Sequence, residues 1–201
     1  MNSESTPIID CAGTSSLTTQ KSITTETATP EEQIETAHAT LTAALRADLL
    51  DRIKAASPAF FEQLIVDLLV ALGYGGGREE MGRALGKSGD GGVDGIIKED
   101  ALGLDVVYIQ AKRYTTGAVG RPEVQGFAGS LAGFKASKGV FVTTSRFAAS
   151  AKEYVDRIQA RIVLIDGDEL TRLLVKHNVG VRVRDVYQVK KVDEDYFDTE
   201  I

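Results

Sequence analysis

The chain has 201 residues, 43% of them apolar, a formal net charge of −6, one cysteine and two histidines. This length allows one well-buried domain with a tail or small appendage, but not two full domains. Cys11 alone cannot form an internal disulfide, and two histidines with one cysteine do not supply a zinc cluster. No apolar run approaches the roughly 18 to 20 residues that cross a bilayer, so we expect a cytoplasmic protein.

Charge is unevenly distributed along the chain. Residues 1–50 carry −5 and residues 190–201 carry −3, whereas residues 51–189 carry 19 basic and 17 acidic groups, a net +2. A local positive field matters more for nucleic-acid binding than the total charge. The charge pattern therefore permits a DNA partner without requiring one.

The first segments are a leader and a long helix. Residues 1–29 contain thirteen Ser or Thr residues and no apolar period, which predicts a disordered leader. Thr29, Pro30 and Glu32 then form the pattern of a capping box, so a helix should span residues 30–56. This helix should pack on the core or link to it. Its apolar residues recur at intervals of three and four, and we expect this stripe to pack on another part of the chain: Ile34, Ala37, Leu41, Leu45, Leu49 and Ile53.

Helical and strand patterns alternate over residues 57–201, which we take as the main domain. Helices are predicted from Pro58 to Gly73, from Arg121 to about Lys138, over 148–158 and over 168–176. Strands are predicted beside Asp94, over 105–114, 139–144 and 161–165, with a weaker edge strand over 181–192. The order predicts an α/β fold.

Asp94 and the segment Gln110 to Lys112 carry the strongest chemical pattern. Four glycines surround Asp94 between residues 88 and 97, so a substrate could approach its carboxylate without side-chain obstruction. In the strand over 105–114, Tyr108, Gln110 and Lys112 alternate with apolar residues and share one face. We expect that face to be polar and reactive, and the opposite face to be core.

These residue types can perform phosphodiester hydrolysis. Asp94, the Gln110 side-chain oxygen and the Ala111 carbonyl are hard oxygen ligands suited to Mg²⁺. The Lys112 ammonium would orient the attacking water or neutralise charge on the phosphate. As an isolated pattern, however, this spacing is more often accidental: Asp94 could cap a turn and Lys112 could be a solvated edge charge.

Several uninterrupted segments between Thr29 and Phe197 closely resemble the catalytic domain of the Mrr-type (type IV) restriction endonucleases, in the PD-(D/E)xK nuclease superfamily. The segments that carry the resemblance occur in one order: Phe60–Gly75, Gly86–Asp100, Tyr108–Arg113, Gly120–Gln125, Thr143–Ser145 and Val163–Gly167. The resemblance implies a restriction-endonuclease-like mixed central sheet flanked by helices.

The resemblance also assigns roles to individual residues. Asp94 matches the motif aspartate, Lys112 matches the motif lysine, and Gln110 stands where the wider superfamily has Glu or Asp. The Mrr branch itself carries this glutamine. Glu62 matches the first-helix glutamate associated with the metal site, although on sequence alone it is equally a solvated helix charge. Possible DNA contacts are Gln125, Arg113 and Arg121, for which surface positions are the alternative.

One departure from the family concerns recognition. Mrr proteins typically carry a winged-helix DNA-recognition domain before the nuclease domain, and residues 1–29 are too short and unpatterned to form one. The implied function is a Mg²⁺-dependent endonuclease that restricts foreign, methylated double-stranded DNA, with a homodimer on DNA by analogy. The alternatives are a non-catalytic DNA-binding remnant and a structure-specific DNA nuclease.

Overall fold

The computed structural model describes residues 28–75, 93–99 and 104–198. The chain divides into two compact units, residues 1–38 and 39–201, and the sheet with its flanking helices belongs to the second. The predicted leader lies outside the described residues except for its last two positions, as does the glycine-rich stretch up to Gly92. None of the described helices has the length and apolarity needed to cross a membrane.

Helix α1 spans Pro30–Ala55 and begins at the predicted capping box. The Thr29 N–H donates to the Glu32 carboxylate at 2.7 Å, and the Glu32 N–H donates to the Thr29 hydroxyl at 3.3 Å. The prediction that its whole apolar stripe packs on the domain is wrong. Within the second unit, Leu49 and Ile53 of α1 are buried, whereas Leu41 and Leu45 are exposed. Ile34 and Ala37, which belong to the first unit, are exposed as well.

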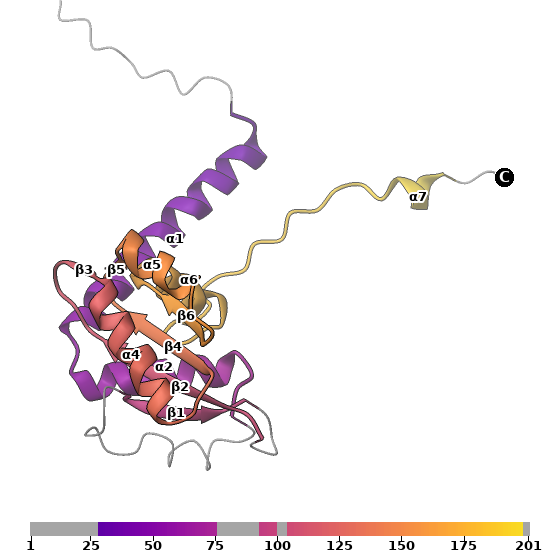
Figure 1. The fold of residues 1–201 in the computed structure, drawn as a ribbon. Coiled ribbons are helices and arrows are strands. Elements are labelled where there is room, and N and C mark those ends of the chain that lie inside the picture. The colour runs from indigo at the N-terminus through magenta and orange to yellow at the C-terminus, as the bar shows by residue number, and fades with distance from the viewer. Residues whose placement is uncertain (1–27, 76–92, 100–103, 199–201) are drawn as a thin grey trace, which may run out of the picture. The chain divides into compact units, whose positions relative to one another are not determined.

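A four-stranded mixed sheet forms the centre of the second unit, in the order β1-β2-β4-β6 (Figure 1). Its strands are β1 (Gly95–Lys98), β2 (Val106–Lys112), β4 (Lys138–Thr143) and β6 (Arg161–Ile165). β1 runs antiparallel to β2, whereas β2, β4 and β6 are parallel. Two short strands absent from the sequence prediction, β3 (Ala118–Val119) and β5 (Arg146–Phe147), pair separately.

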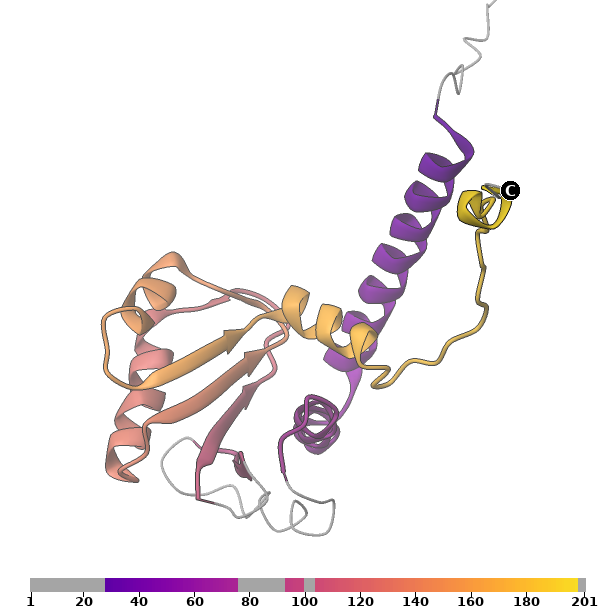
Figure 2. The ribbon, with the colours of Figure 1, turned by 90° about the vertical axis from the view of Figure 1, so that its right-hand side faces the viewer.

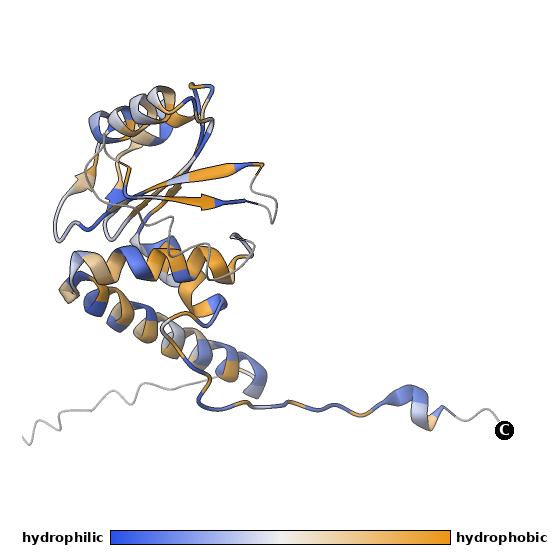
Figure 3. Cartoon of the chain, turned by 90° about the horizontal axis from the view of Figure 1, so that it is seen from below, coloured by the Kyte–Doolittle hydropathy of each residue, from blue (hydrophilic) through white to orange (hydrophobic). Residues whose placement is uncertain are grey.

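Helices cover both faces of this sheet (Figure 2). On one face, α2 (Pro58–Ala71), α6 (Gly167–Lys176) and the end of α1 bury a core with Val107, Ile109, Val140 and Val142. On the other, α4 (Arg121–Gly133) and α5 (Ala149–Val155) bury Tyr108 and Phe141. Figure 3 shows in orange the apolar residues of the sheet and of α2. The predicted fold class, a mixed sheet flanked by helices, is confirmed.

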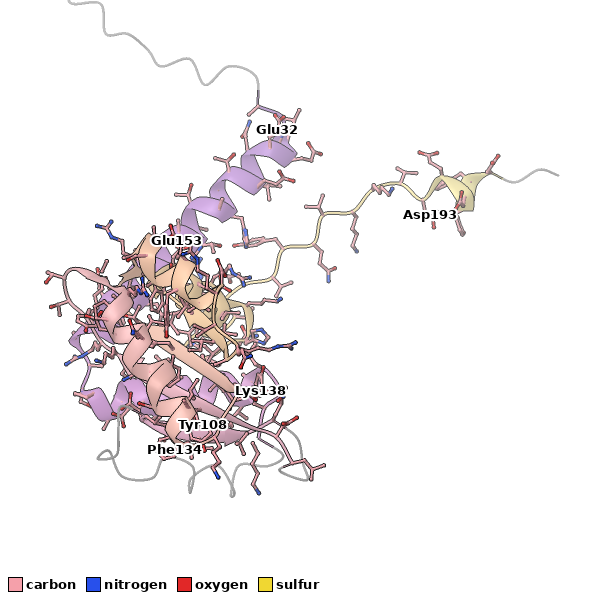
Figure 4. The ribbon with its side chains drawn as sticks, in the orientation of Figure 1. Glu32, Tyr108, Phe134, Lys138, Glu153 and Asp193 are labelled. Atoms are coloured by element: carbon pink, nitrogen blue, oxygen red, sulfur yellow. The ribbon has the colours of Figure 1, made fainter. Side chains whose placement is uncertain are left out.

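The sequence predicted that one face of β2 is polar and reactive and that the opposite face is core. This prediction is wrong, because side chains on both faces are buried. Tyr108 and Gln110 are only 9% and 6% exposed, because α4 covers the face that the alternation left polar. The Tyr108 ring stacks on Phe134 with centroids 5.3 Å apart (Figure 4). Phe134 follows the end of α4 and is 45% exposed.

The chain after Val181 is extended and contains no strand before α7 (Glu194–Phe197). The predicted edge strand over 181–192 is therefore wrong. Val183, Val186, Val189 and Val192 recur every third residue and are exposed, whereas a strand face requires every second residue. Their spacing does not give a one-sided surface that could pack on the sheet.

Candidate active site

The candidate residues meet at the edge of the sheet where the parallel strands end. β2 ends at Lys112, β4 at Thr143 and β6 at Ile165, while the antiparallel β1 begins there with Gly95. The register pairs Gly95 with Ile109, so Asp94, one residue earlier, lies opposite Gln110. Open α/β sheets commonly bind ligands at this edge.

Two hydrogen bonds fix Asp94 on β2. Its N–H donates to the Ile109 carbonyl at 2.8 Å, and its Oδ2 accepts from the Ala111 N–H at 2.7 Å. The Asp94 carboxylate thereby accepts the hydrogen bond from the Ala111 N–H that a main-chain carbonyl would accept if β1 were longer. The Asp94 carboxylate is held beside the Ala111 peptide.

Gln110 is a buried side chain with an unsatisfied oxygen. Its Oε1 is inaccessible to solvent and has no hydrogen-bond partner among the described residues. An unsatisfied buried carbonyl oxygen costs about 1 to 3 kcal/mol, and such groups are rare in native structures. The orphaned oxygen belongs to a side chain that the sequence predicted as a metal ligand.

Glu62 projects from α2 and is half-buried. Burial is the main cause that raises the pKa of Glu62 above its ordinary value of 4.5, and the negative charge of Asp94 raises this pKa further. The negative charges of the Glu62 and Asp94 carboxylates therefore repel one another. A cation between them would remove the repulsion.

The hydroxyl group of Thr144, the residue that follows β4, holds the chain immediately after Lys112. Lys112 itself is half-buried and pairs in register with Thr143. The Thr144 Oγ1 accepts from the Tyr114 N–H at 3.0 Å and donates to the Tyr114 carbonyl at 2.8 Å. This contact was not predicted, although the Thr143–Ser145 segment was among those that carry the family resemblance. The chain is thus held on both sides of Arg113, by Thr143 at the end of β4 and by Thr144 just after it.

The donor set fits a hard cation. Across the described ranges, no three His, Cys, Asp or Glu side chains are grouped as a metal cluster. The site instead offers two carboxylates, Glu62 and Asp94, with the amide oxygen of Gln110 and the main-chain carbonyl of Ala111. These are all oxygen ligands of the kind that Mg²⁺ and Ca²⁺ take, and the orphaned Oε1 lacks the partner that such an ion would supply.

Comparison with known proteins decides the family. The Mrr_cat family model, described as a restriction endonuclease, matches residues 53–174. The chain is also 43% identical over 169 residues to the type IV methyl-directed restriction enzyme EcoKMrr of Escherichia coli K12. The chain belongs to the Mrr_cat restriction endonuclease family. The match covers 84% of this chain and 54% of that relative, so the chain spans about half the length of the curated protein it matches.

Solved restriction endonucleases resemble this Mrr-type domain in fold. The DNA modification-dependent restriction endonuclease AspBHI shares 22% identity with a TM-score of 0.50, over 77% of this chain and 38% of its own. The MspJI restriction endonuclease in complex with a 27-mer oligonucleotide shares 28% identity with a TM-score of 0.49, over 66% and 31%. The AspBHI likeness agrees with the observed mixed sheet.

The three predicted DNA-contact residues of this Mrr-type domain lie in different settings. Gln125 is exposed on α4, and Arg121, at the start of α4, is exposed with its guanidinium carbon 5.2 Å from the Tyr154 ring centroid. Arg113 is half-buried and donates to the Lys54 carbonyl at 2.8 Å and to the Ala56 carbonyl. The sequence alone could have indicated that Arg113 points into the protein. By strand alternation it shares the face of Ile109 and Ala111, which packs against α1, α2 and α6.

Proposed function

We propose that the domain is a Mg²⁺-dependent DNA endonuclease with Asp94, Gln110, Lys112 and Glu62 as its active-site residues. The observation that carries the proposal is the Oε1 of Gln110, which is buried opposite Asp94 and has no hydrogen-bond partner among the described residues. A cation ligand is the simplest role for an oxygen that is buried at a cost and belongs to the residue opposite Asp94 on the neighbouring strand.

In this proposal, Glu62, Asp94, Gln110 and the Ala111 carbonyl would hold Mg²⁺, which would supply Lewis acidity and an activated water. Asp94 keeps its orientation because Oδ2 accepts from the Ala111 N–H, so the carboxylate need not reorganise during the reaction. Lys112 shares the face of Gln110 and brings an ammonium to the phosphate. Its charge offsets the negative charge that develops on the phosphate oxygens.

The substrate class follows from the relatives. The E. coli relative is named a methyl-directed enzyme and AspBHI a modification-dependent one. We therefore propose double-stranded DNA, with methylated DNA as the restricted form. Because this chain spans about half of the E. coli relative, preference for methylated sites is a separate proposal from cleavage chemistry.

Plasmid cleavage tests the active-site assignment. Wild-type protein with Mg²⁺ should nick or linearise plasmid, and EDTA should stop it. Asp94→Asn keeps an acceptor for the Ala111 N–H but loses the charge, and Lys112→Met keeps most of the side-chain volume. Each should reduce cleavage by at least about a hundredfold while thermal unfolding stays cooperative.

Exposed substitutions on α5 provide the control, because Lys152→Met and Glu153→Gln lie outside the proposed site and should cut like wild type. Cleavage that survives in both Asp94→Asn and Lys112→Met would overturn the site. DNA binding in EDTA without cleavage of methylated, unmethylated or branched DNA in Mg²⁺ would favour the non-catalytic alternative. Cutting confined to branched DNA would favour the structure-specific nuclease.

A further inference from the structure

We infer that Arg113 is a positioning residue: it ties the helix that carries Glu62 to the strand that carries Gln110 and Lys112. This inference rests on the proposed function, since it concerns how the same four residues are brought together. It assigns Arg113 to the inside of the protein rather than to a DNA phosphate.

The contacts of Arg113 point inward. Its Nη1 donates to the carbonyls of Lys54 and Ala56, the first within the last turn of α1 and the second just after it. The last carbonyls of a helix have no partner within the helix and carry partial negative charge, so a guanidinium satisfies them well. These bonds are long-range in sequence and attach β2 directly to the connection between α1 and α2.

The connection between α1 and α2 is so short that a shift at the end of α1 also shifts the start of α2. Only Ala56 and Ser57 separate α1 from α2, and Ser57 caps α2 by accepting from the Phe60 N–H at 3.2 Å. Glu62 follows in the second turn of the same helix. Since a helix moves as a rigid rod, a displacement of Ala56 would displace the Glu62 carboxylate relative to Asp94.

The strand side of the tie is equally constrained. Lys112 pairs with Thr143 in the β-ladder, and Tyr114 exchanges two hydrogen bonds with Thr144. Arg113 lies between these two anchored residues, so its backbone cannot drift along the sheet edge. One side chain thereby sets the distance between two parts of the proposed metal site, which come from segments more than forty residues apart.

Arg113→Met tests the tie by removing the donors and keeping an unbranched apolar stem, while Arg113→Lys keeps the charge and loses the planar fork. The concentration of Mg²⁺ for half-maximal plasmid cleavage should rise about tenfold or more in Arg113→Met and less in Arg113→Lys, as for other residues that orient metal ligands. The rise in melting temperature that Mg²⁺ produces without DNA should shrink in the same order.

DNA affinity measured against salt concentration in EDTA separates this role from a phosphate contact. Arg113→Met should keep the wild-type slope, as should Arg157→Met, an exposed arginine paired with Glu153 that serves as the charge-matched control. A slope reduced by about one unit in Arg113→Met, with an unchanged Mg²⁺ requirement, would overturn the inference in favour of a phosphate contact.

The remaining outcomes are also decisive. Wild-type Mg²⁺ dependence in both Arg113 variants overturns the inference while the proposed function stands. If Arg113→Met does not fold, Arg113→Lys alone must show the raised Mg²⁺ requirement, and a normal requirement there overturns the inference. Absence of Mg²⁺-dependent cleavage in the wild-type arm overturns the proposed function and this inference together.

Discussion

At the scale of single residues, Gln110 shows a conflict between stability and the proposed function. A buried amide oxygen without a partner raises the free energy of the metal-free fold. The cost is tolerable if a cation supplies the missing partner whenever the domain is loaded. A site of this kind should become more stable when its polar group is removed.

Gln110→Met should therefore stabilise the metal-free protein. The substitution keeps an unbranched chain of similar length and removes the unsatisfied oxygen, so we expect a gain of about 1 kcal/mol, or roughly 2 to 4 °C in melting temperature. Differential scanning calorimetry in EDTA measures the shift. The same variant should lose Mg²⁺-dependent cleavage, and a lower melting temperature than wild type would contradict the interpretation of Oε1.

Glu62 gives a pH-dependent prediction. Its pKa is raised, first by burial and then by Asp94, so the ionised form is disfavoured in the metal-free fold. A carboxyl with a raised folded-state pKa contributes stability at low pH and loses it as the pH rises through that pKa. Glu62→Gln should accordingly melt at a higher temperature than wild type at pH 7 in EDTA.

The difference should disappear at pH values below 4.5, the ordinary pKa of the group, where wild-type Glu62 is protonated in both states. Millimolar Mg²⁺ at pH 7 should narrow or reverse the difference, because the cation favours the ionised carboxylate. Thermal scans from pH 4 to pH 8, with and without Mg²⁺, check both points. A Glu62→Gln protein that melts below wild type at pH 7 in EDTA would refute the prediction.

At the scale of elements, close packing between α4 and β4 depends on Gly139. A Cβ at this position would lie 2.8 Å from the Phe127 ring and 3.0 Å from Leu131. Gly139→Ala should destabilise the domain by about 1 to 3 kcal/mol through overpacking.

Gly129→Ala is the control for Gly139→Ala, because Gly129 lies on α4, the helix that packs against Gly139. It has open space around the added methyl and should stabilise α4 by about 0.5 to 1 kcal/mol, because alanine is the better helix former. Urea unfolding of both variants measures the two free energies. Equal effects of the two substitutions would contradict the packing argument.

Local signals predicted the elements well, and tertiary contacts explain the misses. The capping box at Thr29 and the proline at the start of α2 act within one turn, so sequence reveals them. The burial of Tyr108 depends on α4 crossing the sheet, and the exposure of Leu41 depends on where the core ends. Neither is encoded within a local window, so periodicity alone predicted both incorrectly.

The candidate site was predictable to the extent that strand geometry fixes it. Alternation placed Gln110 and Lys112 on one face, and the antiparallel register brings Asp94 opposite Gln110. The proximity of Glu62 came only from family resemblance, because it depends on how α2 crosses the sheet. The Asp94 bond to the Ala111 N–H and the Thr144 bonds to Tyr114 need three-dimensional placement and had no sequence signal of their own.

At the scale of the whole molecule, the charges on the chain are arranged so that DNA binding stays compatible with a net charge of −6. Residues 51–189, which contain every proposed site residue, carry a net +2, and the acidic excess lies in residues 1–50 and 190–201. Salt should weaken this binding in proportion to the number of phosphates that the domain contacts. Cleavage of both DNA strands then depends on how many copies of the domain meet on one site.

Within the described residues, the chain holds one set of the proposed catalytic groups, which can attack one phosphate at a time. We therefore expect a single copy to nick DNA and two copies to linearise it. Nicking of a plasmid should rise in proportion to protein concentration, and linearisation about as its square, when both are quantified on gels at fixed Mg²⁺. Addition of excess Asp94→Asn protein should convert linear product to nicked product, because mixed pairs cut one strand. Linear product that rises in proportion to nicked product at every concentration, and that is merely diluted by the inactive variant, would show that one copy cuts both strands.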